Sequence, residues 1–322
     1  MTSASSLRIV RILLTGASGF VGSTLAPTLL AEGHDLRALT RAPERARVAL
    51  AGAPGIEVVR GDVLSGEGLP RALKHIEVAY YLIHSMESRP AGASQRAFTE
   101  RERLGASTFA AHAQRAGVSR IVYLGGPLPR SAHASRHLAS RAEVQEILFE
   151  HVPASVALRA SIVIGARSRS FRLLVRLVER LPVLTLPAWR RFRSQPIDVR
   201  DVIEMLAAAA HLPAAAGRTL DIGGPEALTY EELLLRIAEL LLLSRPTLGL
   251  GVTMTPLTAR LVAALTGEDP ELILPLMESL EGDLLPAGDH ADELLGVELH
   301  AFDDAVECAL REWEAVEPLA AR

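Results

Sequence analysis

The feature that most constrains the fold is a glycine-rich turn between an apolar run and a helical pattern near the N-terminus. Residues 9–14 are apolar and rich in β-branched side chains, the pattern of a strand buried on both faces. Three glycines follow with the spacing GxxGxxG, and residues 24–32 then have a helical pattern that ends at Gly33. In such a turn the first glycine permits a sharp bend, the second leaves room for a pyrophosphate, and the third allows close helix packing. We therefore predict a pyrophosphate-binding turn made by Gly16, Ser18, Gly19, Phe20, Val21 and Gly22.

Short apolar runs and helical patterns continue to alternate along the first half of the chain. The runs predict strands at 35–39, 56–59, 78–83, 120–124 and within 155–164, with helices at 94–116 and 137–150. This alternation predicts an α/β fold with a Rossmann-type, doubly wound parallel sheet. Because right-handed crossovers bring the carboxyl ends of parallel strands to one edge, we expect the ligand there.

Residues at the predicted strand ends are therefore candidates for cofactor binding. The second strand ends at Arg41, where NAD-selective Rossmann folds carry an acid that binds the adenosine ribose. An arginine there suits a 2′-phosphate, so NADP(H) is predicted rather than NAD(H). Asp62 follows the third strand, where its carboxylate can accept from the adenine amine. The remaining candidates at strand ends are Val63, Leu82, Ile83, His84 and Gly125.

Further motifs follow in a fixed order over about residues 8–226. They are TGASGFVG, LTR, GDV, AYYLIHSM, RIVYLGG, HLASRAEV, LRASIVIG and QPIDVRDV. This series resembles the atypical short-chain dehydrogenase/reductase (SDR) superfamily, and is most similar to bacterial NAD(P)H-binding proteins of the NmrA-like and complex I accessory-subunit-like neighbourhood. The resemblance implies a Rossmann domain of residues 7–165, completed by about 195–226. It also implies a small, mostly helical C-terminal lobe of residues 166–194 and 227–322 for a substrate or partner.

The chain lacks the catalytic tetrad of that superfamily, a Ser, an Asn and a Tyr-xxx-Lys pair on the helix after the fifth strand. It has no asparagine, its one lysine, Lys74, precedes the fourth strand, and none of its four tyrosines lies within 137–150. The resemblance places His137 and Arg141 at the Tyr and Lys positions, one helical turn apart. In one reading both are catalytic and His137 transfers a proton. In the other, Arg141 anchors the cofactor and His137 is structural.

No metal site is predicted. His133 and His137 have the i, i+4 spacing of a helical zinc pair. A third ligand and a flanking glutamate are not apparent in the sequence.

Composition excludes several other classes. No apolar run reaches the roughly 20 residues of a membrane-spanning helix. The leader MTSASS lacks the apolar core of a signal peptide, and the single cysteine, Cys308, is consistent with a reducing cytoplasm. With a net charge of −4 and no recognised reader motif, nucleic acid is not an expected partner.

Eight arginines crowd residues 167–193. Arg172, Arg176 and Arg180 are four residues apart and so share one helical face. They form either a solvated face, whose stems cover apolar surface, or a site for an anionic substrate or a membrane headgroup surface. The acidic stretch 278–304 is able to neutralise them within the fold.

Two functions follow from these observations. The first is an NADP(H)-binding oxidoreductase or epimerase-like enzyme acting on a carbonyl or alcohol centre, where the nicotinamide supplies the hydride. The second is a non-catalytic NADP(H)-dependent sensor or assembly subunit, whose partner binding changes with cofactor state. The missing tetrad favours the second, whereas a deep, polar-lined pocket facing the nicotinamide would favour the first.

Overall fold

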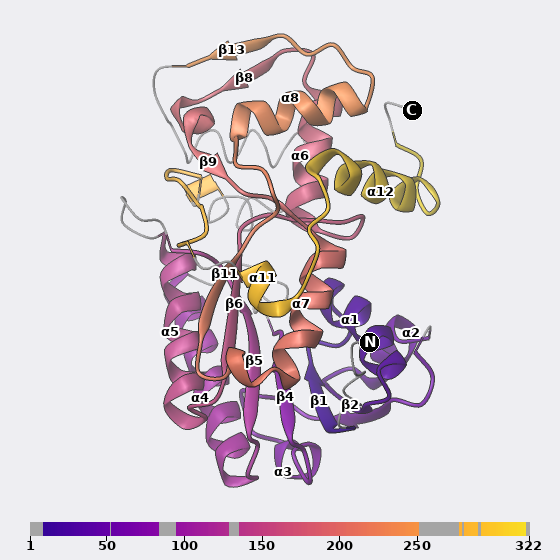
Figure 1. Ribbon diagram of the computed structural model, residues 1–322, viewed down its shortest axis with the longest axis vertical. Helices are drawn as coiled ribbons and strands as arrows, with labels where there is room; N and C mark the ends of the chain where they lie inside the picture. Colours follow the sequence, from indigo (N-terminus) through magenta and orange to yellow (C-terminus); the bar gives the residue numbers. More distant parts are fainter. Residues whose placement is uncertain are drawn as a thin grey trace, which may run out of the picture.

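The computed structural model describes residues 9–51, 53–83, 95–128, 135–250, 277–278, 280–288 and 291–319. At its centre is a parallel seven-stranded sheet in the order β3-β2-β1-β4-β5-β6-β11 (Figure 1). The strand order reverses between β1 and β4, the switch point at which such sheets bind ligands. The predicted Rossmann-type fold is thus confirmed, with strands β1 (Arg11–Thr15), β2 (Asp35–Thr40), β3 (Glu57–Arg60), β4 (Val78–Tyr81), β5 (Arg120–Gly125), β6 (Val156–Ala160) and β11 (Thr219–Ile222).

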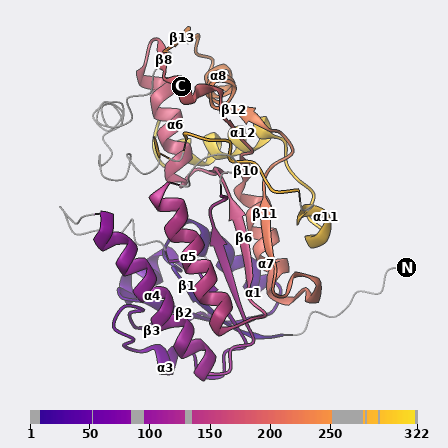
Figure 2. The ribbon, with the colours of Figure 1, turned by 90° about the vertical axis from the view of Figure 1, so that its left-hand side faces the viewer.

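Helices cover both faces of the sheet, as Figures 1 and 2 show. One face packs against α1 (Phe20–Ala31), α7 (Val199–His211) and the short α11 (Ala291–Leu295). The other packs against α3 (Leu69–Ala72), α4 (Gln95–Arg115) and α5 (Arg136–His151). A separate hydrophobic cluster lies on each face, and α2 (Pro43–Ala49) follows β2 at its edge. Among the described residues, no helix is both long and apolar enough to cross a bilayer.

The first helix differs from its predicted start, because α1 begins at Phe20 rather than at Thr24. Gly19 is the N-cap, with φ −76° and ψ 172°, and its carbonyl already accepts from Ser23 N at 3.0 Å. The hydroxyls of Ser23 and Thr24 donate back to the carbonyls of Gly19 and Phe20, each at 2.8 Å. Thr24, the predicted first residue of the helix, is therefore the fifth residue of α1.

A C-terminal lobe stands at the end of the sheet where β6 leads through β7 (Val163–Ile164) into α6 (Figure 1). Its helices α6 (Arg169–Arg180), α8 (Tyr230–Leu240) and α12 (Phe302–Glu314) enclose a third hydrophobic cluster that contains Phe171, Tyr230 and Trp313. The predicted boundaries of the two domains stay a prediction. Beyond its helices the lobe has the short strands β8 (Leu184–Leu186), β9 (Arg193–Ser194), β12 (Leu228–Thr229) and β13 (Thr247–Gly249) and the 3₁₀ helix η2 (Ala188–Arg191). The short strand β10 (Ile197–Asp198) precedes α7, and the 3₁₀ helix η3 (Pro213–Ala215) follows it, where Ala215 joins the core of the sheet domain.

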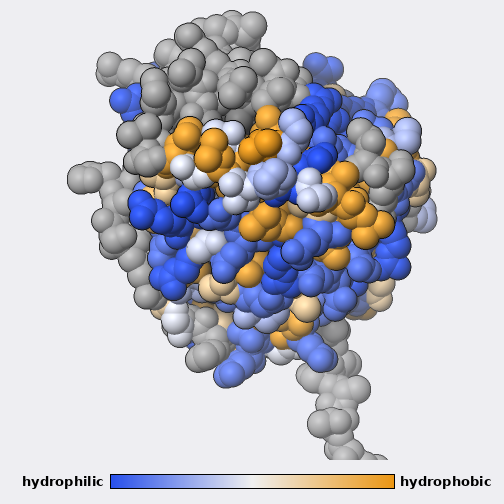
Figure 3. All heavy atoms as spheres, turned by 90° about the horizontal axis from the view of Figure 1, so that it is seen from above, coloured by the Kyte–Doolittle hydropathy of each residue, from blue (hydrophilic) through white to orange (hydrophobic). Residues whose placement is uncertain are grey.

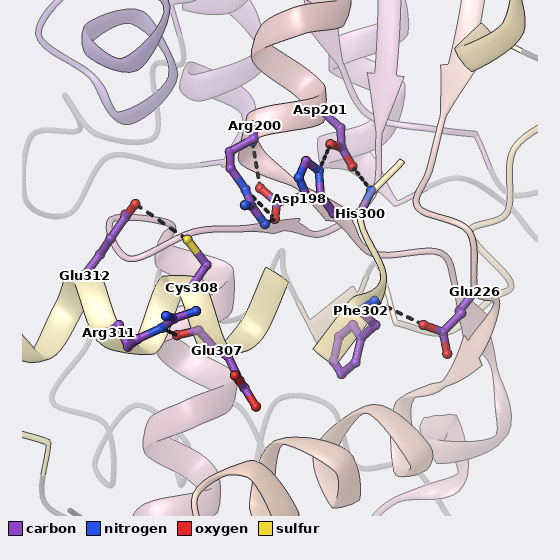
Figure 4. Close-up of polar contacts among 10 residues, drawn as sticks. All are labelled: Asp198, Arg200, Asp201, Glu226, His300, Phe302, Glu307, Cys308, Arg311 and Glu312. Atoms are coloured by element: carbon purple, nitrogen blue, oxygen red, sulfur yellow. Dashed lines mark hydrogen bonds and ion pairs between the residues drawn. The ribbon is translucent and has the colours of Figure 1, made fainter. Parts of the chain in front are cut away.

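Buried and half-buried carboxylates attach the C-terminal segment to the sheet domain (Figure 4). Asp201, fully buried on α7, accepts from His300 N at 3.0 Å and lies 2.5 Å from His300 Nδ1. Glu226 accepts from Phe302 N at 3.0 Å at the start of α12. The motif QPIDVRDV accordingly lies where the chain returns to the sheet domain, since β10 pairs with β7 and α7 follows.

Candidate cofactor site

The glycine-rich turn between β1 and α1 forms the floor of the candidate site. Gly16 has a φ of +66°, and a Cβ on it would lie 2.5 Å from the carbonyl oxygen of Leu82. A Cβ on Gly22 would overlap the carbonyl oxygen of Gly16 and press on the Ala17 backbone. Both positions therefore need glycine for the fold. Gly22 was predicted to let the helix pack closely, and what it packs against is the backbone of the turn rather than the sheet.

Gly19 is different, because the fold itself leaves space there. A Cβ on Gly19 would meet the carbonyl oxygen of Gly16 at 3.1 Å and no other atom within 4 Å. Gly19 caps α1 without a side-chain hydrogen bond, so no side chain covers the first-turn amides. Uncapped amides and the helix dipole favour an anion at this position.

The turn opens into a cavity of about 550 Å³, a size that suits a cofactor site. Its wall runs from the glycine turn, past the ends of β2, β3 and β4, to the loop between β7 and α6. Twelve of the predicted site residues line it, namely Gly16, Ser18, Gly19, Phe20, Val21, Gly22, Arg41, Asp62, Val63, Leu82, Ile83 and Arg141.

Three predicted residues are not among the lining residues. Gly125, at the end of β5, directs its Cβ position at the Tyr123 ring and the Arg159 stem. His137 is buried in α5. His84 lies outside the described residues, as does His133 of the predicted helical pair. Among the residues that the structure does describe, no group of three His, Cys, Asp or Glu could hold a metal ion.

The lining is strongly cationic. A single carboxylate, Asp62, lines the cavity among the described residues. Its Oδ1 accepts from Leu64 N at 2.9 Å, which fixes the loop after β3. Glu44, the nearest acid after β2, is exposed and pairs with Arg47. The cavity is therefore built for an anionic ligand, with six lining arginines, Arg41, Arg45, Arg101, Arg141, Arg167 and Arg169.

Arg141 is the residue on α5 that reaches the cavity. Its guanidinium donates to the carbonyl of Leu124 and lies 5.3 Å from the centre of the Tyr123 ring. Its Nη1 is buried and has no hydrogen-bond partner in the described part of the chain. A buried donor of this kind needs an acceptor, and a ligand in the cavity can provide one.

His137, one turn earlier on α5, is only 7% exposed. Burial, together with the charge of Arg141, lowers the pKa of His137 to about 3. The imidazole is then neutral near pH 7 and has no proton to give as an acid there. Its packing, with the Phe98 ring centre 6.4 Å away, resembles that of a core residue. This buried environment favours a structural role for His137. Its catalytic role stays a prediction.

The tyrosines near the site do not replace a catalytic one. Tyr80, Tyr81 and Tyr123 are buried and none lines the cavity. Burial raises the pKa of all three phenols, that of Tyr123 to about 12. The Tyr123 hydroxyl donates to the Arg141 carbonyl at 3.2 Å, so it positions α5.

Four of the eight arginines in the segment 167–193 pair with carboxylates in the lobe. Arg172 and Arg176 both pair with Glu317, at 2.5 and 3.5 Å, and Arg172 lies 4.2 Å from the Trp313 ring centre. Further along, Arg190 pairs with Glu231 and Arg193 with Asp283. Asp283, the partner of Arg193, lies in the acidic stretch 278–304, whereas Glu317 and Glu231 lie outside it. Seen from the lobe end, hydrophilic residues separate the exposed apolar ones into several groups (Figure 3).

Several lining residues were not predicted. Arg167 and Arg169 were noted only as part of a charged segment, and they reach the cavity because the loop after β7 lies against the start of α1. Ser161 lines the same end and donates to the Gln195 carbonyl at 3.1 Å. Arg101 lies on α4, four residues before Gly105. That spacing, which puts both residues on one face of the helix, is the one feature of the sequence that relates Arg101 to the site.

Comparison with known proteins agrees with this geometry. Residues 16–163 match the family model described as NAD(P)H-binding. A 3 beta-hydroxysteroid dehydrogenase/Delta 5-->4-isomerase of Mycobacterium tuberculosis is 37% identical over 120 residues, which cover 35% of this chain and 30% of that enzyme. The alignment thus spans less than a third of the length of that curated relative.

Solved structures resemble nearly the whole chain. The epimerase Mth375 of Methanothermobacter thermautotrophicus superposes with a TM-score of 0.72 at 19% identity, over 95% of this chain and 92% of its own. The Bordetella bronchiseptica enzyme WbmG, described in complex with NAD and UDP, also gives 0.72, at 16% identity over 98% and 97%. Residues 16–163 therefore resemble the NAD(P)H-binding family, and the chain as a whole has the Rossmann-type fold of these solved structures.

Proposed function

We propose that the chain binds NADP(H) and uses it in an oxidoreductase or epimerase reaction at a carbonyl or alcohol centre. The observation that carries the cofactor choice is the cationic lining, six arginines against one aspartate, with Arg41 directly after β2 and Arg45 on α2. A 2′-phosphate carries close to two negative charges near neutral pH, as other phosphate monoesters do. The described residues that line the cavity at this end include no carboxylate, so the end attracts a 2′-phosphate and offers no acid to the ribose hydroxyls of NAD(H).

The other predicted residues then have distinct roles. The pyrophosphate lies over Gly19 at the N-terminus of α1, and Asp62 accepts from the adenine amine. The Nη1 of Arg141 binds the nicotinamide ribose, the task that the missing lysine has in the catalytic relatives. Arg167 adds a positive charge beside the pyrophosphate. The bound nicotinamide supplies or accepts the hydride.

The substrate of this reaction is proposed to be anionic. Arg169 begins α6, lines the cavity and makes no ion pair with the described residues. It lies with Ser161 and Leu173 at the end of the cavity that the C-terminal lobe closes. Two kinds of compound appear in the names of the similar proteins: a hydroxysteroid for the Mycobacterium tuberculosis enzyme, and UDP for WbmG. Of the two, the positive charge of Arg169 favours the compound that bears phosphate.

Titration of the purified protein with NADPH and NADH tests the cofactor choice. We expect tighter binding of NADPH, and oxidation of NADPH when carbonyl compounds with a phosphate or carboxylate group are added. Equal affinity for the two cofactors would contradict the assignment of the β2 end. Binding of neither would contradict the proposed function as a whole.

A second function, that of an NADP(H)-dependent sensor or assembly subunit of the NmrA-like kind, rests on a separate observation. The described residues that line the cavity include no Tyr, His, Lys or Cys that could exchange a proton with a substrate. Tight NADPH binding without turnover of any carbonyl compound in a broad screen would favour this function over the first.

A further inference from the structure

We propose that Arg101 of α4 binds the adenine base of the cofactor by stacking its guanidinium on the base. The inference rests on the proposed binding of NADP(H) and adds a residue that the glycine turn and the strand ends do not supply. It starts from how α4 lies against the loop after β3, residues 61–68.

One stripe of α4 packs along this loop. A Cβ placed on Gly105 would meet Val63 Cγ2 at 3.3 Å and Leu64 Cδ2 at 3.6 Å. A Cβ placed on Gly66 would meet His112 Cε1 at 3.3 Å and Thr108 Cγ2 at 3.5 Å. Positions 105, 108 and 112 follow the i, i+3, i+7 spacing of one helical face. That face therefore runs along the loop from residue 66 toward residue 63.

Arg101 is the next member of the stripe, one turn before Gly105. Arg101 lines the cavity together with Asp62, Val63 and Leu64 of this loop. It makes no hydrogen bond or ion pair with the described residues. The side chain thus lies at the adenine end of the cavity with its guanidinium available to a ligand.

Its neighbours on α4 face elsewhere, which shows that the placement of Arg101 is specific. Glu102 is 4% exposed, and its charge contributes to the raised pKa of Tyr81 and of Tyr123. Arg103 points at α5, where its Nε lies 3.9 Å from Glu143 Oε1. The helix therefore turns one arginine toward α5 and the other toward the cavity.

The chemistry at this end suits a purine held on two sides. Asp62 offers a carboxylate to the exocyclic amine at the edge of the base, while a planar guanidinium can stack on its face. Such a contact depends on the base and not on the 2′-phosphate. Loss of Arg101 should therefore weaken NADPH and NADH by the same factor, whereas loss of Arg41 should weaken NADPH alone.

The test compares the dissociation constants of NADPH and NADH for four variants, measured by calorimetry. We expect Arg101→Gln to weaken both cofactors about ten-fold, the usual size of a well-formed cation–π contact. Arg101→Lys keeps the charge but not the plane, and is expected to lose most of the same affinity. Arg103→Gln is the matched control on the same helix and should leave both constants unchanged. Arg41→Gln should lower the affinity for NADPH only.

Each other result overturns the proposal in a recognisable way. A loss confined to NADPH in Arg101→Gln would make Arg101 a ligand of the 2′-phosphate. Full rescue by Arg101→Lys would mean that charge and not stacking holds the cofactor. Unchanged affinities would remove Arg101 from the site while the proposed function stands. Failure of the parent protein to bind either cofactor would instead remove the proposed function, and this inference with it.

Discussion

Arg167 donates a hydrogen bond to the hydroxyl oxygen of Ser23 at 2.8 Å, although 144 residues separate the two in the chain. Ser23 in turn donates to the carbonyl of Gly19 at 2.8 Å. A Cβ on Gly165 would lie 2.6 Å from the ring of Phe20, so the loop between β7 and α6 lies directly on the first turn of α1. A residue from the second half of the chain thus borders the candidate phosphate site.

This contact predicts a role for Arg167 in cofactor affinity. We expect Arg167→Gln to weaken NADPH binding about ten-fold or more, because a charge-assisted hydrogen bond to a phosphate is worth roughly 1.5–3 kcal/mol. Ser23→Ala removes the contact partner but leaves the charge, and should cost much less. Calorimetry at low and high salt measures both. An Arg167→Gln loss that is insensitive to salt would contradict an electrostatic role.

Arg41 is expected to set the preference between the two cofactors. Arg41→Ala should lower the affinity for NADPH by about 10- to 100-fold, the worth of one charge-assisted contact, and leave NADH nearly unchanged. Arg47→Ala is the matched control, because Arg47 lies on the neighbouring helix α2, pairs with Glu44 and does not line the cavity. A ratio of the two dissociation constants that stays the same in Arg41→Ala would place the 2′-phosphate elsewhere.

The two glycines of the turn should respond differently to a methyl group. Gly19→Ala meets its one neighbour, the Gly16 carbonyl, at 3.1 Å and is expected to fold with an unfolding temperature close to the parent's. Its cofactor affinity should fall about ten-fold or more, because the methyl group occupies the space of the pyrophosphate. Gly22→Ala forces the same carbonyl to move, so it should lower the unfolding temperature before any cofactor is added. Thermal unfolding without ligand, followed by titration, distinguishes the two; parent-like NADPH affinity in Gly19→Ala would rule out this phosphate site.

The parts of the site that sequence predicts are those fixed by neighbours along the chain. A turn that needs φ of +66° at Gly16, or an arginine one residue past the end of β2, follows from spacing within a few residues. Gly16, residues 18–22, Arg41 and Asp62 were predicted for this reason, and all of them line the cavity.

The residues that sequence did not predict depend on contacts between distant segments. Arg101 reaches the cavity because α4 packs along the loop after β3, and Arg167 because the loop after β7 lies against the start of α1. Arg172 is a further example, because its carboxylate partner is Glu317, 145 residues away in the same chain. A charge pattern on one helix does not reveal which carboxylate the fold will bring to it.

The buried histidine of α5 predicts how stability changes with pH. Burial and the neighbouring Arg141 lower the pKa of His137 to about 3, whereas a histidine in the unfolded chain titrates near 6.5. Between these values the unfolded chain binds a proton that the folded chain excludes. The free energy of unfolding therefore decreases as the pH falls from about 6.5 toward 3.

His137→Gln removes this proton-linked cost, so its free energy of unfolding should fall less steeply than the parent's over that range of pH. The measurement is urea unfolding of both proteins at pH 7 and at pH 4.5. The change in the free energy of unfolding between the two pH values is then compared between His137→Gln and the parent. His75→Asn is the control, because His75 is exposed and its φ of +61° is one that asparagine tolerates. Its pH dependence should match the parent's. Parallel curves for His137→Gln and the parent would mean that His137 is hydrated and protonated in the folded protein, and would return it to the candidates for the proton donor.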